Sequence, residues 1–251
     1  MPSPLLVFDF DGVLVDGMPE YWWSARAAAL SLDPGLDLPE QAPIGFARLR
    51  PLIHKGWEMV LMAAELSGDG ADGEAQAIDY ERSLAAALAR RGWSPGTLQA
   101  ALEQVRAEAI AADPEVWLAR HRFYPGVVER LRQLPAEGAD WLVLTTKGGA
   151  FAARILASAG LEPCAVYGHE QGSKPEVLGR LLQQERAGRP LWFVEDRRST
   201  LECVCADPAL LAVRCFLVSW GYLGPEDMRD LPARIQRLDP ARFAAPLAQW
   251  P

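Results

Sequence analysis

The stretch LLVFDFDGVLVDG, residues 5–17, carries an apolar run directly into a pair of aspartates. The strand-like run covers residues 5–10, and its unbroken apolar part ends at Asp9. Phe10 separates Asp9 from the second acid, Asp11. A short apolar run without polar alternation is typical of a strand that is covered on both faces of a parallel sheet. Two acids at the end of such a strand point to a functional site, because a simple turn or helix cap does not need both carboxylates.

Further strand-like and helix-like segments alternate after residue 124. Apolar runs cover residues 141–145, 165–167, 191–194 and 215–220, and helix-like segments cover 150–161 and 174–188. This alternation is typical of a parallel sheet with right-handed crossovers. The tail after Trp220 contains Gly-Pro and Asp-Pro breaks and one short helix, and we expect it to close the structure without forming part of a site.

Residues 18–121 have a different character. They are rich in Ala, Leu, Arg, Glu and Gln, as in YERSLAAALARRGW, and contain no convincing strand-like run. We therefore predict an α/β protein with a Rossmann-like parallel-sheet core over residues 1–17 and 122–251. An inserted α-helical domain covers residues 18–121.

Composition excludes several classes of protein. The 251 residues are 50% hydrophobic, which is enough for a substantial core, and the formal net charge is −8. An acidic chain is poorly suited to non-specific binding of nucleic acid or of anionic lipid. No apolar stretch reaches the roughly 20 residues that a membrane span needs, and the four cysteines form no CxxC pair. We expect a cytoplasmic protein that binds neither nucleic acid nor membrane; its oligomeric state is open.

Polar residues follow three of the expected strands. Asp9 and Asp11 follow the first, residues 145–149 (TTKGG) end the second, and residues 195–196 (Glu-Asp) end a third. Lys174 lies just before the helix that leads into that third strand. Ligands of open parallel sheets bind outside the carboxyl ends of the strands, so these groups are expected to share one edge.

The residue types at this edge favour phosphoryl chemistry. Converging carboxylates repel one another unless a cation is present, and Mg²⁺ prefers oxygen ligands. Lys174 and the Thr145 hydroxyl add a positive charge and a donor, and the glycines after Thr146 allow backbone N–H groups to approach an anion. One carboxylate can attack phosphorus while another moves protons. For Lys147, solvent exposure is the simpler expectation.

Residues 9–16, DFDGVLVD, resemble the first motif of the haloacid dehalogenase-like hydrolase superfamily. Thr145, Lys174-Pro175 and Glu195-Asp196 resemble its second, third and fourth motifs in the same order. The resemblance implies that Asp9 is the nucleophile that becomes an aspartyl-phosphate. It also implies that Asp11 is the general acid/base and binds Mg²⁺ through its backbone carbonyl. By the same resemblance, Thr145, Thr146 and Lys174 hold the phosphoryl oxygens. The metal site is completed by Asp9, Glu195 and Asp196.

The resemblance also bears on the subclass. Phosphotransferases of this superfamily carry the second aspartate, so Asp11 argues against carbon–halogen cleavage. Residues 18–121 resemble the superfamily's helical cap, and the adjacent Glu195-Asp196 pair is similar to that of beta-phosphoglucomutase-like members. Arg197 and Arg198 depart from the usual pattern and could screen or contact the carboxylates.

The helical insert contains a basic stretch, residues 48–59 (RLRPLIHKGWEM). Its cationic or titratable residues form either a solvated helix face or contacts to the leaving group of the substrate. These residues are Arg48, Arg50, His54 and Lys55.

The sequence thus predicts a Mg²⁺-dependent phosphatase that hydrolyses a small phosphorylated metabolite. The alternatives are a phosphomutase, which would return the phosphoryl group to a sugar, and a catalytically silent protein that binds a phosphorylated ligand or a partner. The sequence does not name the substrate.

Overall fold

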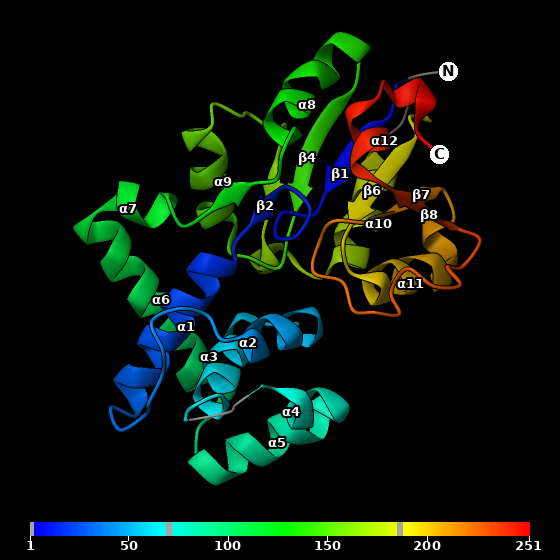
Figure 1. Cartoon of the computed structure of the whole chain (residues 1–251). Coiled ribbons are helices and arrows are strands. Elements are labelled where there is room, and N and C mark those ends of the chain that lie inside the picture. Colours follow the sequence, from blue (N-terminus) through cyan, green and yellow to red (C-terminus); the bar gives the residue numbers. More distant parts are fainter. Residues whose placement is uncertain (1–2, 69–71, 185–187) are drawn as a thin grey trace. The chain divides into compact units, whose positions relative to one another are not determined.

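The computed structural model describes residues 3–68, 72–184 and 188–251. The chain divides into two compact units, one formed by residues up to 16 together with 122–251 and the other by residues 17–121 (Figure 1). We call them the sheet unit and the helical unit. The sequence analysis placed the first boundary after residue 17, whereas the two units divide after residue 16. Both place the second boundary between residues 121 and 122.

The sheet unit is built on a six-stranded parallel sheet with the order β5–β4–β1–β6–β7–β8 (Figure 1). Counted along the chain within this sheet, the order is 3-2-1-4-5-6, the arrangement of the doubly wound Rossmann-type fold. This confirms the predicted fold class. The strands are β1 (Leu5–Phe8), β4 (Asp140–Leu144), β5 (Val166–Tyr167), β6 (Leu191–Glu195), β7 (Val213–Val218) and β8 (Ile235–Leu238).

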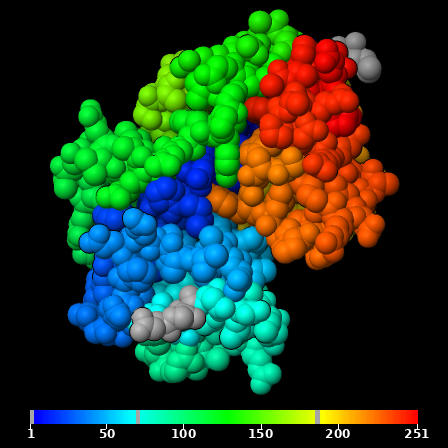
Figure 2. All heavy atoms as spheres, in the orientation of Figure 1, coloured from blue at the N-terminus to red at the C-terminus, as the bar shows by residue number. Residues whose placement is uncertain are grey.

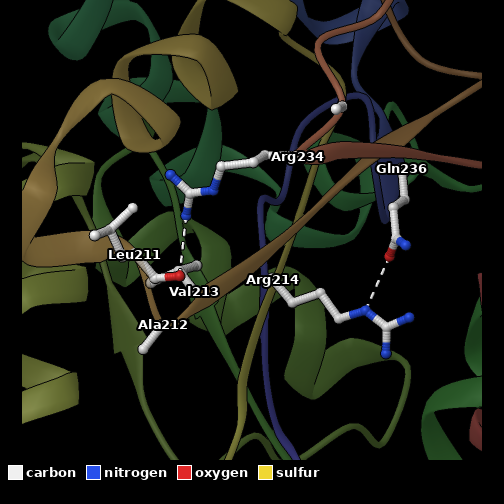
Figure 3. A pocket seen from close by; sticks show the side chains of 7 residues that line it. Leu211, Ala212, Val213, Arg214, Arg234 and Gln236 are labelled. Atoms are coloured by element: carbon white, nitrogen blue, oxygen red, sulfur yellow. Dashed lines mark hydrogen bonds between the residues drawn. The ribbon is translucent and has the colours of Figure 1, made fainter.

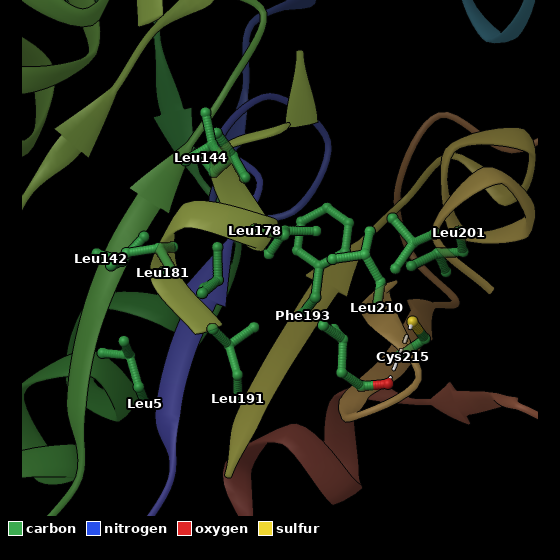
Figure 4. Packing of buried hydrophobic residues seen from close by; sticks show 14 of the residues in the cluster. Leu5, Leu142, Leu144, Leu178, Leu181, Leu191, Phe193, Leu201, Leu210 and Cys215 are labelled. Carbon is green, nitrogen blue, oxygen red and sulfur yellow. Dashed lines mark hydrogen bonds between the residues drawn. The ribbon is translucent and has the colours of Figure 1, made fainter. Parts of the chain in front are cut away.

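The central strands are buried almost without interruption, as their apolar sequences predict. On one face, Leu5 and Val7 pack in a cluster with Phe193 of β6 and with Leu178 and Leu201 of the covering helices (Figure 4). The helices of the sheet unit are α8 (Val127–Gln133), α9 (Gly149–Ser158), α10 (Lys174–Gln184), α11 (Arg198–Ala206) and α12 (Pro240–Ala244).

The opposite face of the sheet is lined by aromatic side chains. Phe8 makes edge contacts with Trp141 and with Phe243 of α12, and Trp250 packs on Trp192 of β6 at 5.9 Å between ring centroids. The C-terminal segment, red in Figure 2, lies beside α8 in green. The last residues of the chain therefore complete this aromatic layer.

Two short strands form an antiparallel ribbon at the point where the helical unit is inserted. In β2 (Val15–Asp16) and β3 (Arg122–Phe123), Val15 pairs with Phe123 and Asp16 with Arg122. The chain therefore leaves the sheet unit and returns to it on neighbouring strands.

The helical unit contains α-helices and no strand among its described residues. α1 packs against α3 and α6, and a buried ion pair joins α1 to α6, where Arg106 donates to both carboxylate oxygens of Glu20 at 2.7 Å. The helices are α1 (Met18–Leu32), α2 (Ile44–Leu49), α3 (Gly56–Glu65), α4 (Glu74–Ile78), α5 (Tyr80–Arg91), α6 (Pro95–Ala112) and α7 (Pro114–Leu118).

The sequence predicted the strands β1, β4, β5, β6 and β7 and the helices α9 and α10 within a few residues. It did not predict the strands β2, β3 and β8 or the helices α8 and α11. The predicted helix 174–188 corresponds to α10, which ends at Gln184; residues 185–187 lie outside the described residues. Of the helices in the described part of the chain, none combines the length and the apolar character that crossing a membrane would require.

Candidate active site

The predicted site residues of the sheet unit follow the carboxyl ends of β1, β4 and β6. β1 is flanked by β4 and β6, with Phe8 in register with Val143 on one side and Val194 on the other. Asp9 and Thr145 therefore follow neighbouring strands, and Glu195 ends the strand on the other side of β1. This edge is the topological switch point of the sheet, where doubly wound folds bind their ligands.

Lys174, the first residue of α10, joins two of the carboxylates. Its Nζ lies 2.7 Å from Oδ1 of Asp9 and 2.5 Å from Oε2 of Glu195. Burial, followed by the nearby charge of Glu195, raises the pKa of Asp9 to about 7, although Lys174 opposes the rise. Burial disfavours the charge on Lys174, but Asp9 and Glu195 outweigh it and raise the pKa of the ammonium group. The lysine thus stays protonated and bridges the two acids.

Glu195 and Asp196 are buried at the end of β6. Oε1 of Glu195 accepts hydrogen bonds from the backbone N–H groups of Asp196 and Arg197, both at 3.1 Å. Oδ2 of Asp196 accepts one from the backbone N–H of Tyr222 at 2.8 Å. Backbone N–H groups therefore fix both carboxylates, and Lys174 adds a second contact to Glu195.

The donor set at this edge fits a hard divalent cation. Asp9, Glu195 and Asp196 are all buried, and each offers a carboxylate oxygen within 4.8 Å of those of the other two. Together with Asp11 they make four carboxylates near two lysines, Lys174 and Lys147. When all are ionised, the excess is two negative charges, which one divalent cation would neutralise.

Asp11 forms an ion pair with Lys147. The Lys147 Nζ lies 3.4 Å from Oδ1 of Asp11, and the two side chains are only 3% and 12% exposed. The expectation that Lys147 is exposed was therefore wrong. The turn after β4 directs its side chain into the sheet unit, where the Asp11 carboxylate compensates the cost of burying an ammonium group.

Thr145 is buried and Thr146 is exposed. The Thr145 Oγ1 accepts a hydrogen bond from the backbone N–H of Lys147 at 3.0 Å. The N–H of Gly149, at the start of α9, donates to Oε1 of Glu170 at 2.9 Å. This glycine N–H was expected to approach an external anion, but here it binds a carboxylate of the protein itself.

Arg198 extends from the start of α11 toward the segment that follows β7. Its guanidinium group pairs with Glu202 at 2.7 Å and donates to the backbone carbonyl oxygens of Glu226 and Arg229. These contacts fix the 226–230 segment. For Arg197, the backbone N–H takes part in the site through its bond to Glu195.

The four basic candidates of the helical unit lie in different environments. Arg48 is exposed and pairs with Asp72 at 3.5 Å, whereas Arg50 is buried with its guanidinium 5.0 Å from the centre of the Tyr21 ring. His54 and Lys55 are exposed, and the His54 backbone N–H donates to Glu58 at 2.7 Å. Their proposed contact with substrate stays a prediction.

Tyr222 is a site residue that sequence reasoning missed. Its backbone N–H binds Asp196, and its hydroxyl donates to Oδ1 of Asp16 at 2.8 Å. In the same segment, the Trp220 Nε1 donates to the carbonyl oxygen of Val13 at 3.1 Å. The expectation that the tail only closes the structure was therefore wrong. The available signal was position alone, since residues 219–224 directly follow an apolar strand, as the predicted site segments do.

A hollow of about 250 Å³ lies in the sheet unit near the amino end of β7, away from the strand ends described above (Figure 3). The Arg234 guanidinium donates to the backbone carbonyl of Leu211 at 3.1 Å, and Arg214 donates to Gln236 at 2.9 Å. Both guanidinium groups of its lining thus bind groups of the protein, and the hollow does not include the predicted site residues.

Comparison with known proteins assigns the chain to a family. The family model of haloacid dehalogenase-like hydrolases matches residues 4–199, and the chain belongs to this family. The match includes the candidate carboxylates and Lys174 and stops before Tyr222. The resemblance stated from the four motifs is thereby confirmed. Among curated proteins, no sequence matches the chain.

Solved structures share the fold at low sequence identity. One, from Haemophilus somnus, is a phosphoglycolate phosphatase assigned by prediction, with 21% identity, a TM-score of 0.60 and coverage of 96% of this chain and 95% of that one. A haloacid dehalogenase-like hydrolase from Streptococcus pneumoniae has 15% identity, a TM-score of 0.57 and coverage of 94% and 93%. A proposed beta-phosphoglucomutase from Thermotoga maritima has 17% identity, a TM-score of 0.54 and coverage of 96% and 97%.

Proposed function

We propose that this hydrolase is a Mg²⁺-dependent phosphatase that hydrolyses a small phosphorylated metabolite through an aspartyl-phosphate at Asp9. The observation that carries the proposal is the buried Asp9 carboxylate, held 2.7 Å from the Lys174 ammonium beside Glu195 and Asp196. A carboxylate at a strand end, flanked by a fixed cation and by metal-binding oxygens, is suited to attack a phosphoryl group. Family membership supports the same assignment.

In the first half of the reaction, a carboxylate oxygen of Asp9 forms a bond to phosphorus while the bond from phosphorus to the leaving oxygen breaks. Protonated Asp11 gives its proton to that oxygen, which departs as an alcohol. In the second half, Asp11 accepts a proton from water while the water oxygen bonds to phosphorus and the Asp9 acyl-phosphate bond breaks. Free phosphate leaves, and both aspartates return to their starting states.

Thr145, Thr146 and Lys174 are the proposed phosphoryl ligands. The positive charge of Lys174 and the two hydroxyl groups oppose the negative charge of the transferring group. Asp9, Glu195, Asp196 and the Asp11 backbone carbonyl would hold the metal. Bound Mg²⁺ would supply charge neutralisation between these acids and the phosphoryl oxygens.

The helical unit is proposed to act as a cap that excludes bulk water and contributes to substrate choice. Arg48, Arg50, His54 and Lys55 are its candidate contacts to the leaving group. Closed caps of this kind favour transfer to one bound water rather than to solvent. A small metabolite, neither nucleic acid nor membrane lipid, is the proposed substrate class, and the cytoplasm stays the expected compartment.

A phosphomutase is the second candidate. It is favoured by the adjacent Glu195-Asp196 pair, which is similar to that of beta-phosphoglucomutase-like proteins, and by the likeness in fold to the Thermotoga maritima protein. A mutase would return the phosphoryl group from Asp9 to a sugar instead of releasing phosphate. Conversion of a hexose 1-phosphate to the 6-phosphate without phosphate release would select this candidate.

The decisive experiment is a phosphate-release assay with 4-nitrophenyl phosphate and a panel of phosphorylated metabolites, with Mg²⁺ or with chelator. We expect turnover with Mg²⁺ only, and a loss on the order of 10³-fold or more in Asp9→Asn. Asp140→Asn is the matched control, because Asp140 is exposed at the start of β4. Undiminished hydrolysis in Asp9→Asn would refute the mechanism. No hydrolysis by the wild type, with Mg²⁺ binding intact, would favour a silent ligand-binding protein.

A further inference from the structure

Lys147 is fixed through its backbone on both sides. Its N–H donates to the Thr145 Oγ1 at 3.0 Å, and its carbonyl oxygen accepts from the His169 N–H at 3.3 Å. Its side chain is 3% exposed and ends 3.4 Å from Oδ1 of Asp11. A long, flexible side chain is thus anchored at its base and restricted along its length, so that the position of its charge is well defined.

The loop that carries Asp11 is also fixed. The N–H groups of Leu14 and Val15 both bind the carbonyl oxygen of Phe10, at 2.9 and 3.0 Å, and the Gly12 N–H binds the carbonyl oxygen of Val15. Oδ1 of Asp11 is shielded from solvent and accepts no hydrogen bond from the described residues. A buried carboxylate oxygen in such a place is costly unless a positive charge lies nearby. Lys147 supplies that charge.

We propose that Lys147 is a positioning residue for Asp11, holding Oδ1 so that the other carboxylate oxygen, Oδ2, exchanges the proton with the leaving group and with water. The inference rests on the proposed phosphatase function. It assigns to Lys147 an action through Asp11 rather than a contact with phosphate. The proton follows the path given above, from Asp11 to the leaving oxygen and back from water.

The proposal makes a specific prediction about leaving groups. A nitrophenolate departs without much help from an acid, whereas an alkoxide needs a proton as its bond to phosphorus breaks. Loss of the ammonium group should therefore slow the hydrolysis of alkyl phosphates much more than that of an aryl phosphate. A lysine that bound phosphate would affect both substrates alike, mainly through KM.

The test compares 4-nitrophenyl phosphate with the alkyl phosphate that the wild type hydrolyses best in the metabolite panel. For Lys147→Met we expect kcat on the alkyl phosphate to fall about tenfold more than kcat on the aryl phosphate, with both KM values within about threefold of the wild type. Lys147→Arg should restore part of the difference. Arg154→Met, which removes an exposed charge from α9, is the control and should leave the ratio unchanged.

A double variant gives an independent readout. If Lys147 acts through Asp11, adding Lys147→Met to Asp11→Asn should slow alkyl phosphate hydrolysis by less than twofold, because the group it positions is already lost. If Lys147→Met does not fold, Lys147→Gln is measured in the same way, and it should show the same preferential loss on the alkyl ester.

Equal losses on the two esters, or a rise in KM with unchanged kcat, would overturn the role of Lys147 while leaving the phosphatase function standing. Absence of hydrolysis of every ester by the wild type would instead overturn the proposed function. Circular dichroism and Mg²⁺ binding, measured on each variant, identify variants whose fold is damaged.

Discussion

Gly12 lies so close to Asp196 that a Cβ atom built on Gly12 would be 1.9 Å from Oδ2 of that aspartate. Gly12 also has a φ of +94°, which side-chain-bearing residues rarely adopt. In Gly12→Ala, either the loop after β1 or the Asp196 side chain must move. We expect a loss of about 2–4 kcal/mol in the free energy of unfolding and Mg²⁺ binding about tenfold weaker, measured by denaturant unfolding and by calorimetry.

The control for this variant is Gly126→Ala. Gly126 has a φ of +79°, but no other group lies within 4 Å of the place where its Cβ would be. This substitution should cost only the backbone strain, about 1–2 kcal/mol, and should leave Mg²⁺ affinity unchanged. Equal Mg²⁺ affinities in the two alanine variants would contradict the proposed role of Asp196 in the metal site.

The pKa of Asp9 predicts how the metal-free protein responds to pH. Because burial and Glu195 raise this pKa from 3.8 to about 7, the folded state binds the Asp9 proton more tightly than the unfolded state. The contribution of Asp9 to stability is therefore full below about pH 4, falls as the pH rises through 7, and then levels off. In chelator, raising the pH from 5 to 8 should destabilise the wild type but not Asp9→Asn. The difference in unfolding free energy between the two proteins should therefore change by about 2 kcal/mol in favour of Asp9→Asn over this range. Thermal or urea unfolding of both proteins measures this difference.

Added Mg²⁺ should oppose the loss of wild-type stability that accompanies a rise in pH, because the cation and the proton compete for the Asp9 carboxylate. The rise in the Tm of the wild type with Mg²⁺ is expected to be larger at pH 8 than at pH 5.5, and smaller in Asp9→Asn at both values. A Mg²⁺ effect that is equal in wild type and Asp9→Asn would place the bound ion elsewhere.

The buried Glu20–Arg106 pair predicts a stability effect confined to the helical unit. Arg106→Met would leave the Glu20 carboxylate buried without its bidentate partner, and we expect a loss of about 3–5 kcal/mol. Arg90, whose side chain is 60% exposed in its pair with Glu65, is the control, and Arg90→Met should cost less than about 1 kcal/mol. Thermal unfolding compares the two; a small loss in Arg106→Met would show that Glu20 finds another partner.

One substitution distinguishes the contribution of the Tyr222 hydroxyl from that of its backbone N–H. Tyr222→Phe removes the hydrogen bond to Asp16 and leaves the backbone N–H that binds Asp196. We expect a loss of about 0.5–1.5 kcal/mol in unfolding free energy with unchanged Mg²⁺ affinity. Asp16→Asn, which keeps an acceptor at this position, should lose less stability. Weaker Mg²⁺ binding in Tyr222→Phe would mean that the hydroxyl also supports the position of Asp196.

The part of the site that the sequence predicted lies directly after buried strands. Asp9 and the Glu195-Asp196 pair interrupt apolar runs, so their place at one sheet edge follows from the parallel topology alone. The contact between Lys174 and the two carboxylates is consistent with this placement, because α10 begins at Lys174 and leads into β6. Local pattern was sufficient to place these residues at one edge of the sheet, and their roles stay proposals.

Features that depend on tertiary packing could not be predicted from local sequence pattern. Lys147 has the sequence context of an exposed turn, and only the folded loop after β1 shows that Asp11 compensates its burial. The strand β8 contains two polar residues between Ile235 and Leu238, and it lies at the edge of the sheet, where apolar periodicity is weak. Tyr222 reaches Asp196 through its backbone, which no side-chain pattern encodes.

The antiparallel pairing of Val15 with Phe123 has an evolutionary consequence. From the standpoint of the sheet unit, residues 17–121 form one very long loop whose ends are already clamped together. The entropy cost of closing a loop rises only slowly with its length, so this ribbon could accept foreign segments of very different size with little penalty to the framework beneath. Evolution can thus replace the whole segment between the two strands, so that the same catalytic residues of the sheet unit act on different substrates.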